Sequence, residues 1–122
     1  MAIASIPPST HRRWPDLETA LAARVDYDPD VDSLFVAFGQ PRPAVNVPLT
    51  TGQRDYVYLV VDLDTEEVVG VEVEDVRAWA LERHPDWAPL IDAASDDPRP
   101  VPPPARSALA AFLADVVDMA SQ

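Results

Sequence analysis

Four aspartates alternate with other residues between positions 26 and 32, and carboxylates at this spacing could bind a metal ion. Carboxylate oxygens are ligands that Ca²⁺ prefers, and calcium-binding loops present them at alternate positions. Counted from Asp26, an EF-hand loop would also need Gly and Glu where this chain has Val31 and Ala37. The alternative is a polar strand face that leads into an Asx-type turn. The candidate metal ligands here are Asp28, Asp30 and Asp32.

A second acidic cluster lies between two apolar segments and contains Asp62, Asp64 and Glu66. Paired carboxylates can transfer protons when one of them is desolvated. Asp62 and Glu72 could share a face near Gly70, where a ligand or another backbone segment could approach closely. Solvated acids in a turn are the alternative. We therefore keep the acids of this cluster as candidate metal ligands and assign no catalytic residue.

Other residue types that carry catalysis are scarce. The chain has no cysteine, which excludes disulfides, thiolate zinc sites and cysteine nucleophiles. Its two histidines, His11 and His84, are far apart in sequence, and none of its serines lies in a nucleophile elbow. With three glycines in total, it has no glycine-rich phosphate loop. We expect no cofactor, and the sequence argues against an enzyme more than for one.

The charge of the chain is strongly negative. Nine basic residues face 21 acidic ones, for a net charge of -12. Such a field repels nucleic acid and anionic lipid and favours basic proteins or divalent cations, although it could serve solubility alone. The longest apolar run, residues 108–114, is too short to span a bilayer, and the N-terminus lacks the order of a secretory signal. We expect a cytoplasmic protein that contacts neither nucleic acid nor membrane. All basic residues are arginine, which is typical of a GC-rich bacterial genome.

The elements that would position these side chains follow from the apolar pattern. A proline and two acids favour a helix over residues 14–23. Strict alternation then predicts a hairpin over residues 24–38, with Tyr27 opposite Leu34. A short edge strand is expected at residues 45–47, ended by the proline that follows it.

The clearest signal is a second hairpin, with strands at residues 56–64 and 68–74 and a short turn around residues 65–67. The apolar pattern favours Leu59 opposite Val73, and leaves open a shift of two residues that would keep the same faces. The second face of the resulting sheet is partly apolar, so we expect a helix of the same chain or a partner chain to cover some of it. The apolar residues on this face are Phe35, Tyr58, Val60 and Val68.

The C-terminal third reads as helices joined by a stiff spacer. Asp75 is expected to cap a helix over residues 76–84, and a short helix follows within residues 87–94. A proline-rich segment should be extended, and the chain then ends in an amphipathic helix over residues 105–120. This helix could dock on its own sheet or on a neighbouring chain. Its apolar stripe consists of Leu109, Phe112, Leu113, Val116 and Val117.

Three segments within residues 25–75 form a pattern that resembles a known family. In one-letter code they are YDPDxDxLFV at residues 27–36, VDLD at 61–64 and VVGVEV at 68–73. This pattern resembles the small bacterial family catalogued as domain of unknown function 2283. The resemblance implies a compact antiparallel meander followed by a short helix, and it brings no activity and no catalytic residues. Its members look like the small partner in bacterial two-gene modules, which favours an inhibitor or antitoxin-like role. The connection over residues 39–55 and both flanking helices depart from the family.

We therefore predict an α+β fold, an antiparallel meander of four or five strands packed by an N-terminal helix, a short helix after the sheet and the C-terminal helix. Residues 1–13 are expected to form a flexible tail, 14–94 the core domain, 95–104 a linker, and 105–122 a helix that docks on the core or on a partner chain.

The predicted function is protein–protein interaction, by homodimerisation, by capture or inhibition of a basic protein, or by both. The alternative is a small divalent-metal-binding or enzymatic domain that uses the acidic hairpins. The predicted interface residues are Phe35, Tyr58, Val60, Leu109, Phe112, Leu113, Val116 and Val117.

Overall fold

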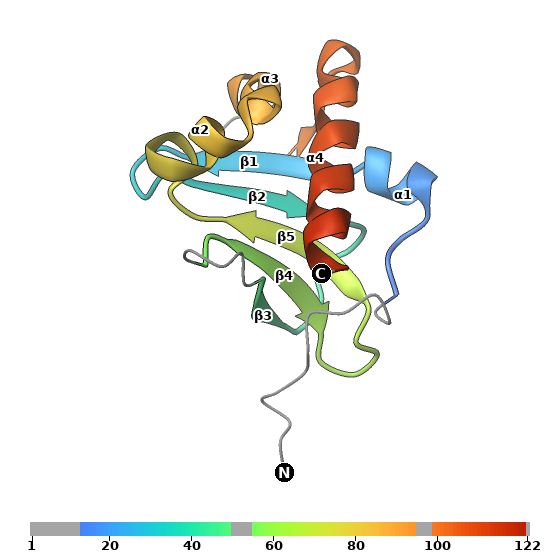
Figure 1. The fold of residues 1–122 in the computed structure, drawn as a ribbon. Coiled ribbons are helices and arrows are strands. Elements are labelled where there is room, and N and C mark those ends of the chain that lie inside the picture. Colours follow the sequence, from blue (N-terminus) through green and yellow to red (C-terminus); the bar gives the residue numbers. More distant parts are fainter. Residues whose placement is uncertain (1–12, 50–54, 95–98, 122) are drawn as a thin grey trace.

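The computed structural model describes residues 13–49, 55–94 and 99–121 (Figure 1). Its strands form one open antiparallel sheet of six, in the order β3-β4-β5-β2-β1-β6. Figure 1 shows the helices gathered on one face of this sheet. The predicted α+β class is confirmed. The sheet exceeds the expected four or five strands because the proline-rich segment contributes β6.

The strands are β1 (Arg24–Asp28), β2 (Ser33–Ala37), β3 (Ala44–Leu49), β4 (Val57–Asp62), β5 (Val68–Val73) and β6 (Arg99–Pro100). The helical segments are α1 (Leu17–Leu21), the π-helical η2 (Val76–Ala80), α2 (Leu81–Arg83), the 3₁₀ turn η3 (Pro85–Trp87), α3 (Ala88–Ala93), the 3₁₀ turn η4 (Pro103–Ala105) and α4 (Arg106–Ala120).

The first hairpin has the predicted register, with Tyr27 opposite Leu34. The second hairpin takes the two-residue shift that the pattern left open, so that Leu59 lies opposite Val71. Between the pairs Val60–Gly70 and Val61–Val68 lies a β-bulge, in which β5 contains one extra residue, Val69. The extra residue reverses the faces beyond it. Val68 therefore belongs to the core beneath the helices, and its prediction on the second face is wrong.

Both outer strands of the sheet contain a proline. Pro48 lies inside β3 and does not end it, because an edge strand tolerates a residue without an N–H. Pro100 lies in β6, which pairs with β1. Residues 50–54 and 95–98 of the expected loop and linker lie outside the described residues. The described part of the linker belongs to the fold, since β6 joins the sheet and Val101 is buried.

The C-terminal helix α4 packs on its own chain. Four residues of its predicted stripe are buried in the core, and Val117 stays 40% exposed. Trp87 joins the helices to one another: its Nε1 donates to Asp115 on α4 at 2.8 Å, and its ring packs edge-on against Phe112. The imidazole of His84 stacks on Trp87 with 4.0 Å between the ring centres. The buried stripe residues are Leu109, Phe112, Leu113 and Val116.

The N-terminal helix is confirmed as α1, shorter than expected, with Asp16 as its N-cap rather than as a helical residue. The Asp16 carboxylate accepts a hydrogen bond from the backbone N–H of Thr19 at 2.8 Å. Residues 1–12 of the expected tail lie outside the described residues. Arg13 is tied to the sheet, because its carbonyl accepts a hydrogen bond from the N–H of Val68 at 2.8 Å.

The helix after β5 begins differently from the prediction. Asp75 has a positive φ of 52° and its side chain makes no capping hydrogen bond. The cap comes from Asp32, in the turn of the first hairpin, whose carboxylate accepts from the N–H groups of Arg77 at 2.9 Å and Ala78 at 3.1 Å. Its backbone carbonyl also accepts from the N–H of Val76 at 3.0 Å. A residue more than forty positions away thus satisfies the first N–H groups of this helix.

A fourth hydrogen bond completes the Asp32 site: the Tyr27 hydroxyl donates to the Asp32 carboxylate at 2.6 Å. Partial burial opposes ionisation of Asp32. The hydrogen bonds from Tyr27 and from the helix N–H groups outweigh it, and the pKa of Asp32 lies below its ordinary value. Burial, followed by the hydrogen bond to Asp32, raises the pKa of Tyr27. Asp32 is therefore ionised and structural.

Replacing Asp32 by Ala should destabilise the fold by about 2 kcal/mol, because helix caps and hydrogen bonds to charged groups are each worth roughly 1–2 kcal/mol. Urea-induced unfolding at neutral pH measures this. Asp30→Ala, in the same turn and exposed, is the matched control and should change stability by less than about 0.5 kcal/mol. Equal losses in the two variants would contradict the capping role.

Candidate functional site

The face of the sheet opposite the helices presents a row of side chains that crosses five strands. Backbone pairing places Asp26 beside Phe35, Phe35 beside Glu72, Glu72 beside Tyr58, and Tyr58 beside Pro48. Residues directly opposite in antiparallel strands share a face and have neighbouring side chains. We call these five residues the acidic–aromatic row, because each of its two aromatic rings lies beside at least one carboxylate.

The row is held in place and remains accessible. Pro48 is exposed, and the other four residues are partly exposed. The Asn46 side-chain amide donates to the Glu72 carboxylate at 2.6 Å, which orients it between the two rings. A hydrogen bond with Glu74, followed by partial burial, raises the pKa of the Tyr58 hydroxyl. Two of the predicted interface residues, Phe35 and Tyr58, therefore lie in one row.

An apolar strip formed by Ala37, Gly70 and Val60 runs beside the row on the same face. A Cβ on Gly70 would lie 2.8 Å from the carbonyl oxygen of Val36 and 3.5 Å from the Phe35 ring. The close approach expected at this glycine is therefore made by a neighbouring strand and by an aromatic ring of the same chain. The backbone of β2 is what requires glycine here, because a Cβ would overlap the Val36 carbonyl oxygen, whereas its contact with the Phe35 ring would be an ordinary one.

Part of this face is covered by a loop of the same chain, not by the helix that was one expectation. Residues 38–42, after β2, line a cavity of about 150 Å³ together with Phe35, Val60 and Val69. Val60 and Val69 are only 9% and 7% exposed. The Arg24 guanidinium donates to the carbonyl of Gly39 at 3.1 Å and holds the loop from the side of β1.

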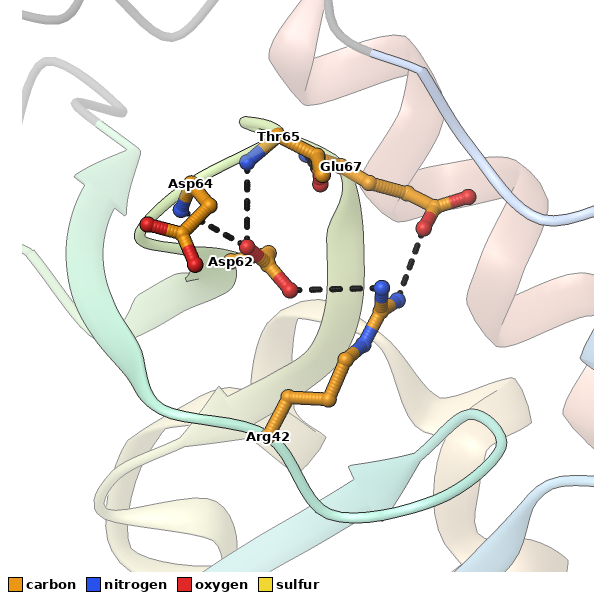
Figure 2. A network of polar contacts seen from close by, with 5 residues as sticks. All are labelled: Arg42, Asp62, Asp64, Thr65 and Glu67. Atoms are coloured by element: carbon orange, nitrogen blue, oxygen red, sulfur yellow. Dashed lines mark hydrogen bonds and ion pairs between the residues drawn. The ribbon is translucent and has the colours of Figure 1, made fainter.

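Figure 2 shows how the far end of the loop is attached. Arg42 lies 3.2 Å from the Asp62 carboxylate and donates to Glu67 at 2.7 Å, so it joins the loop to the second hairpin. The other Asp62 oxygen accepts from the N–H groups of Asp64 at 2.7 Å and Thr65 at 3.0 Å. These two hydrogen bonds, with a smaller contribution from Arg42, lower the pKa of Asp62. The Asp64 carboxylate points away from Arg42 (Figure 2).

The structure does not bring the candidate metal ligands together. Asp28 accepts from the N–H of Asp30 at 3.0 Å, which is the Asx-type turn of the alternative interpretation. Asp32 caps a helix, and Asp62 is bound to Arg42 and to its own turn. Glu66 is exposed, with a positive φ of 61°. Within residues 13–49, 55–94 and 99–121, no group of three or more His, Asp or Glu side chains could hold a metal ion.

Sequence reasoning missed several residues of this site. The sequence places Asp26 on a polar strand face and Glu72 on a face with Asp62 near Gly70, and it does not predict that the Phe35 ring lies between Asp26 and Glu72. Arg42 lies in a loop and gave no signal of its role. The predicted interface residues Leu109, Phe112, Leu113 and Val116 line the core of the same chain, which leaves Val117 as the exposed member of that stripe.

Neither known protein families, nor curated proteins, nor solved structures gave a match to the chain. The resemblance of residues 25–75 to the family of unknown function therefore stays a prediction. In the part of the chain that the structure describes, no helix combines the length and apolarity needed to cross a bilayer. A function for the protein is therefore argued from the geometry and charge of its own surface.

The Asp62 network predicts a specific pH dependence for Asp62→Asn. Because the pKa of Asp62 is lower in the folded chain, its charge stabilises the fold above the ordinary carboxyl pKa, and this contribution is lost as pH falls through the folded pKa. The wild type should exceed Asp62→Asn in urea midpoint above about pH 5, and the gap should narrow progressively as the pH falls below the ordinary carboxyl pKa. Asp64→Asn, in the same turn, should show no such gap. A gap that stays constant from neutral to acidic pH would contradict this account.

Proposed function

We propose that the protein is a binding module whose helix-free sheet face captures a basic segment of another protein. The acidic–aromatic row carries this proposal. Its carboxylates, Asp26 and Glu72, lie on either side of the Phe35 ring, and Glu72 also adjoins Tyr58. An arginine or lysine laid across the row would meet a ring face and a carboxylate together.

The chemistry of the row suits guanidinium groups in particular. A cation over an aromatic ring gains roughly 0.5–1 kcal/mol at exposed sites, and a planar guanidinium can also bind a carboxylate with two parallel hydrogen bonds. The chain uses the same pairing internally. The Arg77 guanidinium lies 5.4 Å from the centre of the Tyr27 ring, and that of Arg83 lies 3.4 Å from the centre of the Trp79 ring.

The charge of the face favours a basic partner over a second copy of the chain. Asp26, Asp28 and Glu72 all lie on it, while Arg24 and Arg42 are engaged with the loop and the second hairpin. With a net charge of -12, two copies placed face to face would oppose like charges. Edge-to-edge pairing of sheets is disfavoured by the prolines of β3 and β6. We therefore favour binding of a basic partner over homodimerisation.

This function would be that of an acidic inhibitor or antitoxin-like partner acting in the cytoplasm. Partner and compartment are both part of the proposal. The charge of the face supports it, because electrostatic attraction speeds association and makes it sensitive to salt.

The proposal predicts binding of a defined probe, a twelve-residue peptide that alternates arginine and valine. Amide shifts in an NMR titration should concentrate on the row and weaken as salt is raised. Glu72→Gln should weaken binding about tenfold, which corresponds to roughly 1.4 kcal/mol. Phe35→Ala should do the same provided its melting curve shows a folded chain.

The matched control is Glu82→Gln, which removes an equal charge from α2, where the Glu82 side chain is 81% exposed. It should leave the affinity within about twofold. Equal effects of Glu72→Gln and Glu82→Gln would mean that the peptide responds only to net charge, and would contradict a defined site.

A further inference from the structure

A second surface, on the helix side of the sheet, is an apolar groove of about 560 Å³ between α1 and the C-terminal half of α4. Trp14, Leu17 and Leu21 form one wall, and Ala110, Ala114 and Val117 form the other. Leu17 is 70% exposed and Val117 is 40% exposed. The groove thus presents large apolar side chains to water, which is typical of a surface used for binding.

The α4 wall has the spacing of a helix-packing surface. Ala110, Ala114 and Val117 follow one another at intervals of four and three residues, so they lie along one flank of the helix. The stripe that packs in the core lies beside this flank. Two of the three flank residues are alanine, and small side chains let a second helix approach to the usual interaxial distance of about 8–10 Å. From Ala110 to Ser121 the wall is about 16 Å long, or three helical turns.

The polar groups at the groove favour positive charge. Asp118 lines it together with Ser121, the C-cap of α4. The C-terminal end of a helix carries partial negative charge, and the last turn of α4 contains no basic residue to balance it. None of the residues that line the groove is basic.

We propose that this groove binds a short amphipathic helix of a partner protein, with apolar residues at i, i+3 or i+4 and i+7 and with arginine or lysine beside them. The apolar side chains would enter between Leu17 and Val117, and the basic ones would meet Asp118 and the C-terminus of α4. Helices commonly dock into apolar grooves through anchors with this spacing. The acidity that favours a basic helix also opposes a second copy of this chain.

This inference is independent of the proposed function. The groove lies on the helix side, and the acidic–aromatic row lies on the opposite face of the sheet. Variants of one surface should leave binding at the other unchanged, so either proposal can fail alone.

The test uses a fourteen-residue helical peptide with leucine at i, i+3, i+7 and i+10 and arginine at flanking positions. A control peptide has the same composition with the leucines spread around the helix. Calorimetry should show binding of the first peptide and at least tenfold weaker binding of the second. Amide shifts should cluster at Ala110, Ala114, Val117 and Leu17.

Ala114→Arg places a long cationic side chain on the groove wall and should weaken binding at least tenfold. Ala114 is exposed, so the variant is expected to fold, and a thermal melt checks this. Ser107→Arg is the matched control, since it adds the same charge at an exposed position of the same helix outside the groove. It should bind as the wild type does.

The inference is overturned if Ala114→Arg binds as well as Ser107→Arg, or if the two peptides bind equally. It is also overturned if sedimentation shows a dimer that Ala114→Arg alone dissociates. In that case the groove belongs to a second copy of the chain.

Discussion

The carboxylate of Asp32 holds together parts of the fold that are distant in sequence. It accepts hydrogen bonds from Tyr27 in its own hairpin and from two N–H groups at the start of the helix after β5. These contacts lie at the end of the sheet where β2 meets β5, a pairing that closes a long loop containing β3 and β4. The helix so anchored leads to Trp87, which packs against α4 and completes the core. The acidic turn that suggested a metal site therefore organises the helical layer, and its negative charge is balanced by hydrogen-bond donors from within the chain.

Because the helices pack on one side of the sheet, no helix covers the other face. A β-bulge and a short loop bury part of the apolar surface there. The bulge at the start of β5 moves Val68 into the core and turns Val69 to the open face. The loop after β2 then covers Val60 and Val69, held by Arg24 at one end and Arg42 at the other. What remains accessible is a row in which carboxylates alternate with aromatic rings. The distribution of charge and apolar surface thus differs between the two sides: the row is acidic, and the groove between α1 and α4 is apolar with an acidic end.

Local pattern was enough to predict much of this fold. Alternation of apolar residues gave the register of the first hairpin and the faces of the second as far as its bulge. Helical periodicity gave α4, because a helix that buries one face repeats its apolar residues with a fixed period. The bulge could not be predicted, since nothing in the pair Val68-Val69 says which valine turns inward. Strand β6 could not be predicted, because its two residues lie in a proline-rich segment and are too few to show an alternating apolar pattern. The Asp32 cap joins residues more than forty positions apart, and local capping rules instead favoured Asp75. The acidic–aromatic row could not be predicted because the apolar pattern left open a two-residue shift in the second hairpin. The favoured register would place Tyr58 opposite Glu74, whereas the register in the structure places it opposite Glu72.

The central claim is that the helix-free face is where another protein binds. Site-specific photo-crosslinking inside the cells that make the protein tests it most directly, with Tyr58 replaced by the photoreactive residue p-benzoylphenylalanine. The same replacement at Glu82, exposed on α2 on the other side of the sheet, provides the comparison. We expect irradiation to crosslink position 58, and not position 82, to a basic protein. The crosslinked peptide of that protein should contain arginine or lysine. Crosslinks from position 58 that join only a second copy of the chain, or equal crosslinks from both positions, would contradict it.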